Sequence, residues 1–124
     1  MSSEDRDYAS YNVAMDGSGG EEGTSKVLVI DDEPINCFVI SALLQEEGIQ
    51  CERANNGNQA LEKIAQRLAS IRTNRSLQMY KLIFLDYSMQ GMDGPEVATR
   101  IRQMLDQANV AQPFICCCTA YVEE

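Results

Sequence analysis

Acidic side chains stand at the carboxyl ends of two short apolar runs in this chain of 124 residues. Asp31 and Asp32 directly follow the first run, and Asp86 ends a later one. If these runs are neighbouring strands of one sheet, the carboxylates share a pocket, where like charges repel and raise each other's pKa. A divalent cation relieves that repulsion, and Mg²⁺ commonly binds one or two carboxylates with waters and a phosphate. The pattern therefore predicts a Mg²⁺ site that receives a phosphoryl group.

Asp86 and Thr119 supply the groups that such a transfer needs. The Asp86 carboxylate is the candidate nucleophile and would form an acyl phosphate, while the metal neutralises charge on the transferring group. Thr119 follows a further apolar run, and its hydroxyl is a candidate donor to a phosphoryl oxygen. The simpler alternative is that such aspartates cap turns or helices, as one aspartate at a strand end usually does. Capping accounts for one of these acidic residues but not for all three.

Four segments that could position these residues are predicted to be strands. Val27–Ile30 is a continuous apolar run, which is typical of a strand covered on both faces in a parallel sheet. Lys81–Asp86 has the same character, and residues 49–54 and Phe114–Cys118 are the other two predicted strands.

Three amphipathic helices are predicted between the strands. The first begins at Pro34, which the first turn of a helix tolerates, and ends at Gly48. Pro95 marks the start of the third, and polar residues 70–80 predict a long loop or an extra helical turn before it. The apolar residues at helical spacing are Ile35, Phe38, Val39, Ala42 and Leu43; then Ala60, Leu61, Ile64, Ala65 and Leu68; then Val97, Ile101, Met104 and Leu105.

Strands and helices alternate along the chain, so the predicted fold class is α/β with a doubly wound parallel sheet. Crossovers between parallel strands are right-handed and place helices on both faces of such a sheet. Ligands gather at the carboxyl ends of the strands, where the strand order reverses. The candidate residues Asp31, Asp32, Asp86 and Thr119 all follow or end a predicted strand.

Composition narrows the classes of partner. The formal net charge is −9 at pH 7, which disfavours nucleic acid and anionic membranes because both bind patches of Lys and Arg. No apolar run approaches the roughly 20 residues that span a bilayer, and the N-terminus lacks the apolar core of a secretory signal. We therefore expect a cytoplasmic protein. The absence of histidine excludes histidine catalysis and a role as phosphohistidine donor.

The cysteines and the first 25 residues indicate which parts of the chain are folded. The five cysteines, three of them consecutive at Cys116–Cys118, fit neither a disulfide framework nor a metal motif and are expected to be buried apolar residues. Residues 1–25 contain six acidic residues against one arginine and are rich in glycine. Because such a segment cannot bury enough apolar surface to fold alone, we predict a disordered tail at 1–25 and a folded domain at 26–124.

Three motifs together resemble the receiver domain of two-component response regulators and hybrid histidine kinases. They are Lys26–Asn36, Leu82–Gly94 and Thr119–Ala120, in the family's order. The resemblance covers residues 26–121 and implies a flavodoxin-like fold with strand order 2-1-3-4-5. It also implies phosphorelay signalling, in which a histidine kinase or histidine phosphotransfer protein phosphorylates an aspartate in the presence of Mg²⁺. The resemblance implies a signalling domain rather than an enzyme.

The resemblance also implies a role for each site residue. By position, Asp86 resembles the phosphorylated aspartate of the family. Asp32 resembles a direct metal ligand, Asp31 a second acid that acts mainly through water, and the backbone carbonyl of Ser88 a further ligand. Thr119 resembles the switch hydroxyl that moves onto the phosphoryl group.

The chain departs from the family pattern at several places. Gln90 replaces the usual proline after the acceptor, and the connection at 70–80 is longer than usual. The family's fourth helix, fifth strand and last helix have no counterpart after Tyr121, so no residue is assigned as the phosphoryl-binding lysine or the aromatic switch. We therefore expect an incomplete receiver domain, a fragment of a longer product, with an exposed hydrophobic sheet edge. Asp93 is interpreted as a helix cap and Met89 as loop packing.

Other functions stay open beside the phosphorelay. A receiver-like module could dock a kinase or phosphotransfer protein without being phosphorylated, which the missing lysine favours and the complete acidic trio opposes. A phosphatase with an aspartate nucleophile is disfavoured, because its Asp-x-Asp motif does not match Asp31–Pro34. A nucleotide-binding enzyme is disfavoured because no glycine-rich phosphate loop follows the first strand.

Overall fold

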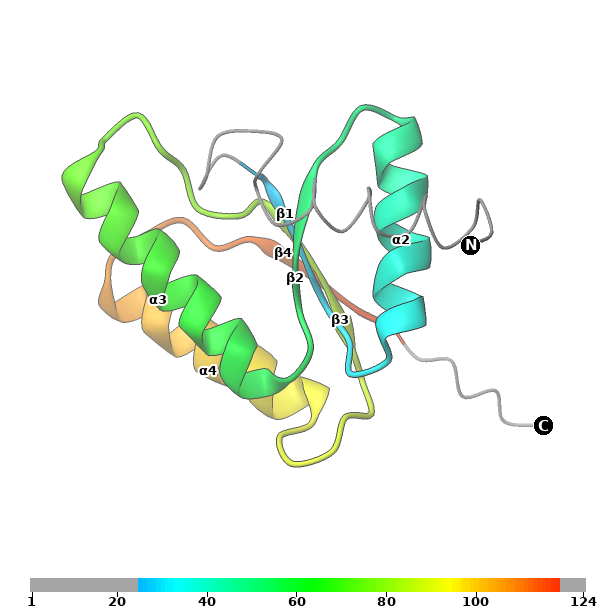
Figure 1. The fold of residues 1–124 in the computed structure, drawn as a ribbon. Helices are drawn as coiled ribbons and strands as arrows, with labels where there is room; N and C mark the ends of the chain where they lie inside the picture. Colours follow the sequence, from blue (N-terminus) through cyan, green and yellow to red (C-terminus); the bar gives the residue numbers. More distant parts are fainter. Residues whose placement is uncertain (1–24, 119–124) are drawn as a thin grey trace.

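The computed structural model describes residues 25–118, which form a parallel sheet with helices on both faces (Figure 1). The elements are β1 (Val27–Ile30), α2 (Pro34–Glu46), β2 (Cys51–Ala54), α3 (Gly57–Thr73), β3 (Leu82–Asp86), α4 (Gly94–Gln107) and β4 (Phe114–Cys118). The strand order is β2-β1-β3-β4, so the predicted doubly wound, flavodoxin-like arrangement is confirmed. Thr119 and the predicted tail up to residue 24 lie outside the described residues.

Strand β1 lies in the interior of the sheet, and this position explains why its sequence is a continuous apolar run. It pairs in parallel with β2 on one side and β3 on the other, with Val27 opposite both Cys51 and Leu82. Successive side chains of a strand point to opposite faces of the sheet. Val27 and Val29 pack on the α2 side, whereas Leu28 and Ile30 join the core under α3 and α4. All four side chains of β1 are buried, as the prediction of a doubly covered strand requires.

The two faces of the sheet carry cores of unequal size. Helix α2 covers one face, and α3 and α4 lie side by side on the other (Figure 1). The larger core includes Leu28, Ile64, Ile83, Ile101 and Leu105, all fully buried. Full burial of such side chains contributes about 1.5–3 kcal/mol each. The smaller core under α2 is built around two valines and two cysteines.

The apolar stripe predicted for α2 is only partly buried, because Phe38 and Ala42 are half-buried but the other three residues are not. Ile35, Val39 and Leu43 face solvent, with 57%, 46% and 59% of their surface exposed. The side chains that meet the sheet are Cys37 and Ser41, both fully buried, with Ile40 and Leu44 packed beside them. Because this helix is apolar on most of its surface, its periodicity does not define one face. Small side chains at the contact let the helix lie close to β1 and β2.

Polar groups define the ends of the helices. Asn56 and Asp93 cap α3 and α4, with side-chain oxygens accepting from the backbone N–H groups of Gln59 (2.8 Å) and Glu96 (3.0 Å). The interpretation of Asp93 as a cap is therefore confirmed. The segment 70–80 was predicted to be a long loop or an extra helical turn, and it contains both. Its first residues end α3 at Thr73, and the rest has no regular structure before β3.

The long connection after α3 is held by a buried ionic cluster that the sequence did not reveal. Arg67 of α3 is 3% exposed and donates to a Glu52 carboxylate oxygen at 2.9 Å and to the Gln78 carbonyl at 2.8 Å. The Tyr80 hydroxyl donates to the other oxygen of Glu52 at 2.7 Å, and the Arg67 guanidinium lies 4.1 Å from the centre of the Tyr80 ring. These contacts tie α3, β2 and the loop before β3 together.

Strand β4 lies at the edge of the described sheet. Helix α2 packs on β1 and β2 rather than on β4. Phe114 at the start of β4 is accordingly 70% exposed. Cys37 and Cys51 are buried as predicted, but Cys117 is exposed and its two neighbours are only half-buried. The expectation that all five cysteines are buried is therefore wrong, because the described residues cover β4 incompletely. The expected exposed hydrophobic edge is present.

Candidate metal centre

Three carboxylates converge at the carboxyl end of the sheet. One side-chain oxygen from each of Asp31, Asp32 and Asp86 lies within 4.8 Å of those of the other two. The convergence follows from strand pairing: β1 and β3 are adjacent and parallel, with Ile30 opposite Leu85. The residues that follow these partners must therefore meet at one edge of the sheet, which is the arrangement expected from the sequence.

Asp31 is fixed most firmly of the three. It is 8% exposed, and its backbone N–H donates to the Ala54 carbonyl at 3.1 Å. Its side-chain Oδ1 accepts from the Glu33 backbone N–H at 2.9 Å, and its carbonyl accepts from the Cys37 thiol at 3.5 Å. These bonds set the direction in which the Asp31 carboxylate points before any ligand binds.

Asp32 and Asp86 make longer hydrogen bonds to the loop after β3. Asp86 Oδ1 accepts from the Ser88 backbone N–H at 3.3 Å, and Asp32 Oδ2 accepts from the Gln90 backbone N–H at 3.4 Å. Both exceed the usual N–H···O distance of about 2.9–3.0 Å, so these bonds hold the carboxylates only loosely. The family's proline at the position of Gln90 would have no N–H to donate. This departure therefore adds a direct link between Asp32 and the loop.

The cluster opposes ionisation of Asp86. Burial raises the pKa of the Asp86 carboxyl, and the nearby Asp31 and then Asp32 charges raise it further, against the Ser88 N–H, which lowers it. Three negative oxygens at this spacing are the hard, oxygen-only ligand set that Mg²⁺ prefers. The residues present therefore fit a divalent cation, which would relieve the repulsion that raises the Asp86 pKa.

Gly94 brings the loop after β3 back against the site. Its backbone N–H donates to the Tyr87 carbonyl at 3.0 Å, and a Cβ placed on it would lie 2.5 Å from the Asp86 carbonyl oxygen. Only glycine permits so close an approach of two backbones. The sequence pattern does not predict this role of Gly94, because the close approach depends on the loop conformation.

The remaining predicted site residues are placed less closely. Ser88 lies two residues beyond Asp86 and is exposed. Thr119 lies outside the described residues, and Cys118 before it is the register partner of Asp86. Met89, interpreted as loop packing, is 8% exposed within the larger core.

Comparison with known proteins identifies the family. The response regulator receiver domain family matches residues 27–124. The chain belongs to this family. Neighbouring solved structures agree: its fold matches the receiver domain of the histidine kinase CKI1 from Arabidopsis thaliana complexed with Mg²⁺ and BeF₃⁻, with a TM-score of 0.72 and 27% identity over 81% of this chain and 68% of that one.

Curated relatives of this receiver domain are much longer proteins. Hybrid signal transduction histidine kinase L from Dictyostelium discoideum is 36% identical over 78% of the chain, which spans 5% of that protein. Sensor histidine kinase RcsC from Escherichia coli is 30% identical over 82% of the chain, which spans 10% of it. Both relatives are histidine kinases. Among residues 25–118, no helix is long and apolar enough to cross a bilayer.

Proposed function

We propose that residues 26–124 form a phosphorelay receiver domain in the cytoplasm, in which Asp86 accepts a phosphoryl group from a phosphohistidine donor. The observation that carries this proposal is the meeting of three carboxylate oxygens within 4.8 Å at the carboxyl end of the sheet. Asp31, Asp32 and Asp86, with the backbone carbonyl of Ser88, are the proposed ligands of Mg²⁺. Binding of Mg²⁺ by the CKI1 receiver domain supports this assignment.

The proposed transfer uses the Asp86 carboxylate as nucleophile. One carboxylate oxygen forms a bond to phosphorus as the bond between phosphorus and the donor imidazole nitrogen breaks, and the leaving imidazole keeps the electron pair. Mg²⁺, when bound, supplies the positive charge that offsets the phosphoryl oxygens and the carboxylates. Asp31, held by its hydrogen bonds, orients the ligand set, and the Thr119 hydroxyl is the proposed donor to a phosphoryl oxygen.

The proposed partner is a histidine kinase or histidine phosphotransfer protein, and the exposed face of α2 is its proposed docking surface. Ile35, Val39 and Leu43 present an apolar stripe to solvent on a helix that begins two residues after Asp32. Because α2 follows Asp32, whose carboxylate lies in the same cluster as Asp86, a donor bound on this surface can be aligned with Asp86.

The test is phosphorylation by a small donor. We expect the chain, incubated with Mg²⁺ and acetyl phosphate, to gain one phosphate by intact mass, and Asp86→Ala to gain none. Asp93→Ala is the matched control, because it removes a carboxylate from the same loop but only a helix cap. An adduct on Asp86→Ala, or none on the parent chain, would overturn the assignment.

A second candidate function is a receiver-like binding module that is not phosphorylated. One observation favours it: within residues 25–118, no lysine or arginine forms an ion pair with Asp31, Asp32 or Asp86. Titration with Mg²⁺ separates the two functions. Saturable binding that Asp32→Asn weakens at least about tenfold supports the phospho-acceptor, whereas no saturable binding supports the binding module.

A further inference from the structure

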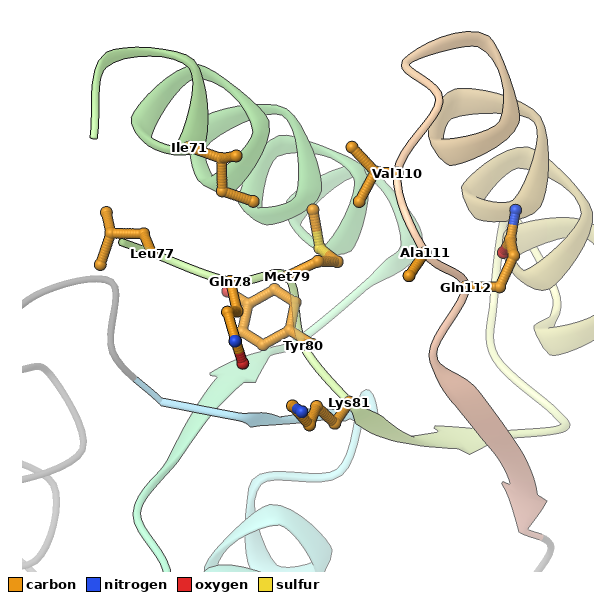
Figure 2. A pocket seen from close by; sticks show the side chains of 9 residues that line it. All are labelled: Ile71, Leu77, Gln78, Met79, Tyr80, Lys81, Val110, Ala111 and Gln112. Carbon is orange, nitrogen blue, oxygen red and sulfur yellow. The ribbon is translucent and has the colours of Figure 1, made fainter. Parts of the chain in front are cut away.

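An apolar hollow of about 470 Å³ lies at the opposite edge of the sheet from the carboxylates. Its walls include Ile71 at the end of α3, Tyr80 before β3 and Val110 before β4 (Figure 2). Lys81, the residue just before β3, lies beside Tyr80 at its edge (Figure 2). The unusually long connection after α3 therefore forms much of this hollow.

A second hollow of about 270 Å³ continues the first. It shares Ile71 and Val110 with the larger one and adds Arg72 and Arg75 to the lining. We call the two together the Ile71 groove, which is defined by Ile71, Arg72, Arg75, Tyr80, Lys81 and Val110. An apolar floor with a charged margin is typical of a binding groove.

The charge on this groove is of one sign. Arg72, Arg75 and Lys81 are exposed, and none of them forms an ion pair with another of the described residues. None of the acidic residues that the structure describes lines the groove. The carboxyl end of α3 explains a basic residue at Arg72, since cations stabilise that end of a helix, but it does not explain the other two. The chain has a net charge of −9, and these three cations have no ion-pair partner within residues 25–118. Three such cations around an apolar floor favour an acidic, partly apolar occupant.

The chain itself contains such a segment. Residues Glu4–Met15 combine three carboxylates, of Glu4, Asp5 and Asp7, and one cation, Arg6, with two tyrosines, a valine and a methionine. The segment is therefore acidic, and its apolar residues follow the charged ones. We propose that Glu4–Met15 docks in cis onto the Ile71 groove. Its tyrosines, Tyr8 and Tyr11, enter the apolar hollow, and its carboxylates pair with the three cations at the margin.

The segment that would dock is joined to the folded domain close to the groove, so the linker has only a short distance to span. The Lys26 carbonyl accepts backbone hydrogen bonds from Lys81 at 2.7 Å and Leu82 at 3.2 Å, so the chain joins the fold beside the groove. Lys26 follows Tyr11 by 15 positions, and the segment between them includes a glycine-rich stretch. A linker of this kind spans about 20 Å on average. A tether of this length gives an effective concentration of about 1 mM, at which weak contacts suffice.

Hydrogen exchange in the full chain tests the proposal. At about 20 mM salt we expect the amides of Tyr8–Met15 to exchange at least about tenfold more slowly than an unstructured peptide. Arg72→Glu with Arg75→Glu should abolish this protection, and so should about 500 mM salt, which screens exposed charges. Tyr8→Ala with Tyr11→Ala should abolish it through loss of the apolar contact.

Matched variants isolate the charge effect. Arg72→Lys with Arg75→Lys should keep the protection, because the charges remain, and so should Arg100→Glu, whose charge lies outside the groove. Unprotected amides in the parent chain at low salt, or protection that survives the glutamate variant, would overturn the proposal. Protection that increases with protein concentration would also overturn docking in cis, because it would place the segment on a second copy.

Discussion

At the scale of single residues, burial, repulsion by neighbouring carboxylates and a hydrogen bond together set the pKa of the Asp86 carboxyl. Its pKa is raised, so the folded state disfavours its ionised form, and the stability that its neutral form provides is lost as the pH rises through that pKa. In buffer without divalent cations at pH 7, Asp86→Asn should therefore raise the melting temperature by roughly a few degrees. Near pH 3 the difference should vanish. Thermal unfolding followed by circular dichroism measures both.

The control for this prediction is Asp93→Asn. It removes the same charge from an exposed helix cap, and asparagine caps a helix as well as aspartate does. We expect its melting temperature to match that of the parent at both pH values. An Asp86→Asn variant no more stable than Asp93→Asn at pH 7 would show that neither burial nor carboxylate repulsion disfavours ionised Asp86 appreciably.

Cys37 and Cys117 should react with thiol reagents at very different rates. Burial raises the pKa of the Cys37 thiol to about 11, with the Asp31 charge adding to the effect, and the side chain is fully buried. Since the thiolate is the reactive form, only about 0.1% of Cys37 is reactive at pH 8. Iodoacetamide should modify the exposed Cys117 at least about 100-fold faster, as peptide mass mapping can show. Equal rates would contradict the buried position of Cys37.

The carboxylate trio could be predicted from sequence because strand pairing alone brings it together. Asp31, Asp32 and Asp86 follow or end two strands that are adjacent in the sheet, so no loop detail is needed. The contributions of Gln90 and Gly94 were missed for the opposite reason. Both act through their backbones, and their positions depend on how the loop after β3 folds back on the site.

At the scale of elements, α2 shows where periodicity fails. Residues on most of its surface are apolar, so the pattern favoured the larger side chains as the buried ones. The structure places Ser41 and Cys37 against the sheet instead, with Ser41 Oγ 3.1 Å from Cys51 Sγ of β2. Helix α4 was predicted well because its apolar residues, including Val97 and Ile101, lie on one side of an otherwise polar helix.

The ionic cluster that joins α3 to β2 should contribute to the stability of the fold. Arg67 is buried against Glu52, and Glu52→Gln would leave its charge without a full partner. We expect a loss of about 3–5 kcal/mol in the free energy of unfolding, measured with urea. Glu96→Gln makes the same change at the exposed pair with Arg100 and should cost less than about 1 kcal/mol. Equal losses in the two variants would contradict the buried character of the first pair.

At the scale of the whole molecule, the sheet has two unequal faces, and the two ends of its strands carry groups of opposite charge. The carboxyl edge carries the acidic trio and the amino edge carries the Ile71 groove, so negative and positive groups are separated along the strands. The fold and the carboxyl edge were predictable from strand order and motifs. The amino edge was not, because it depends on a connection whose residues show no regular pattern.

Within residues 25–118, strand β4 is an edge strand with apolar side chains exposed. Phe114 at the start of β4 is 70% exposed, beside partly buried Leu82 of β3, and an exposed edge strand with apolar side chains tends to pair with other chains. We expect the protein to self-associate as its concentration rises, and Phe114→Lys to reduce this association at least about fivefold in sedimentation experiments. Ile35→Lys adds the same charge at another exposed apolar residue, on α2, and should change it little. If the α2 variant reduced association as much as the β4 variant, net charge rather than the sheet edge would govern self-association.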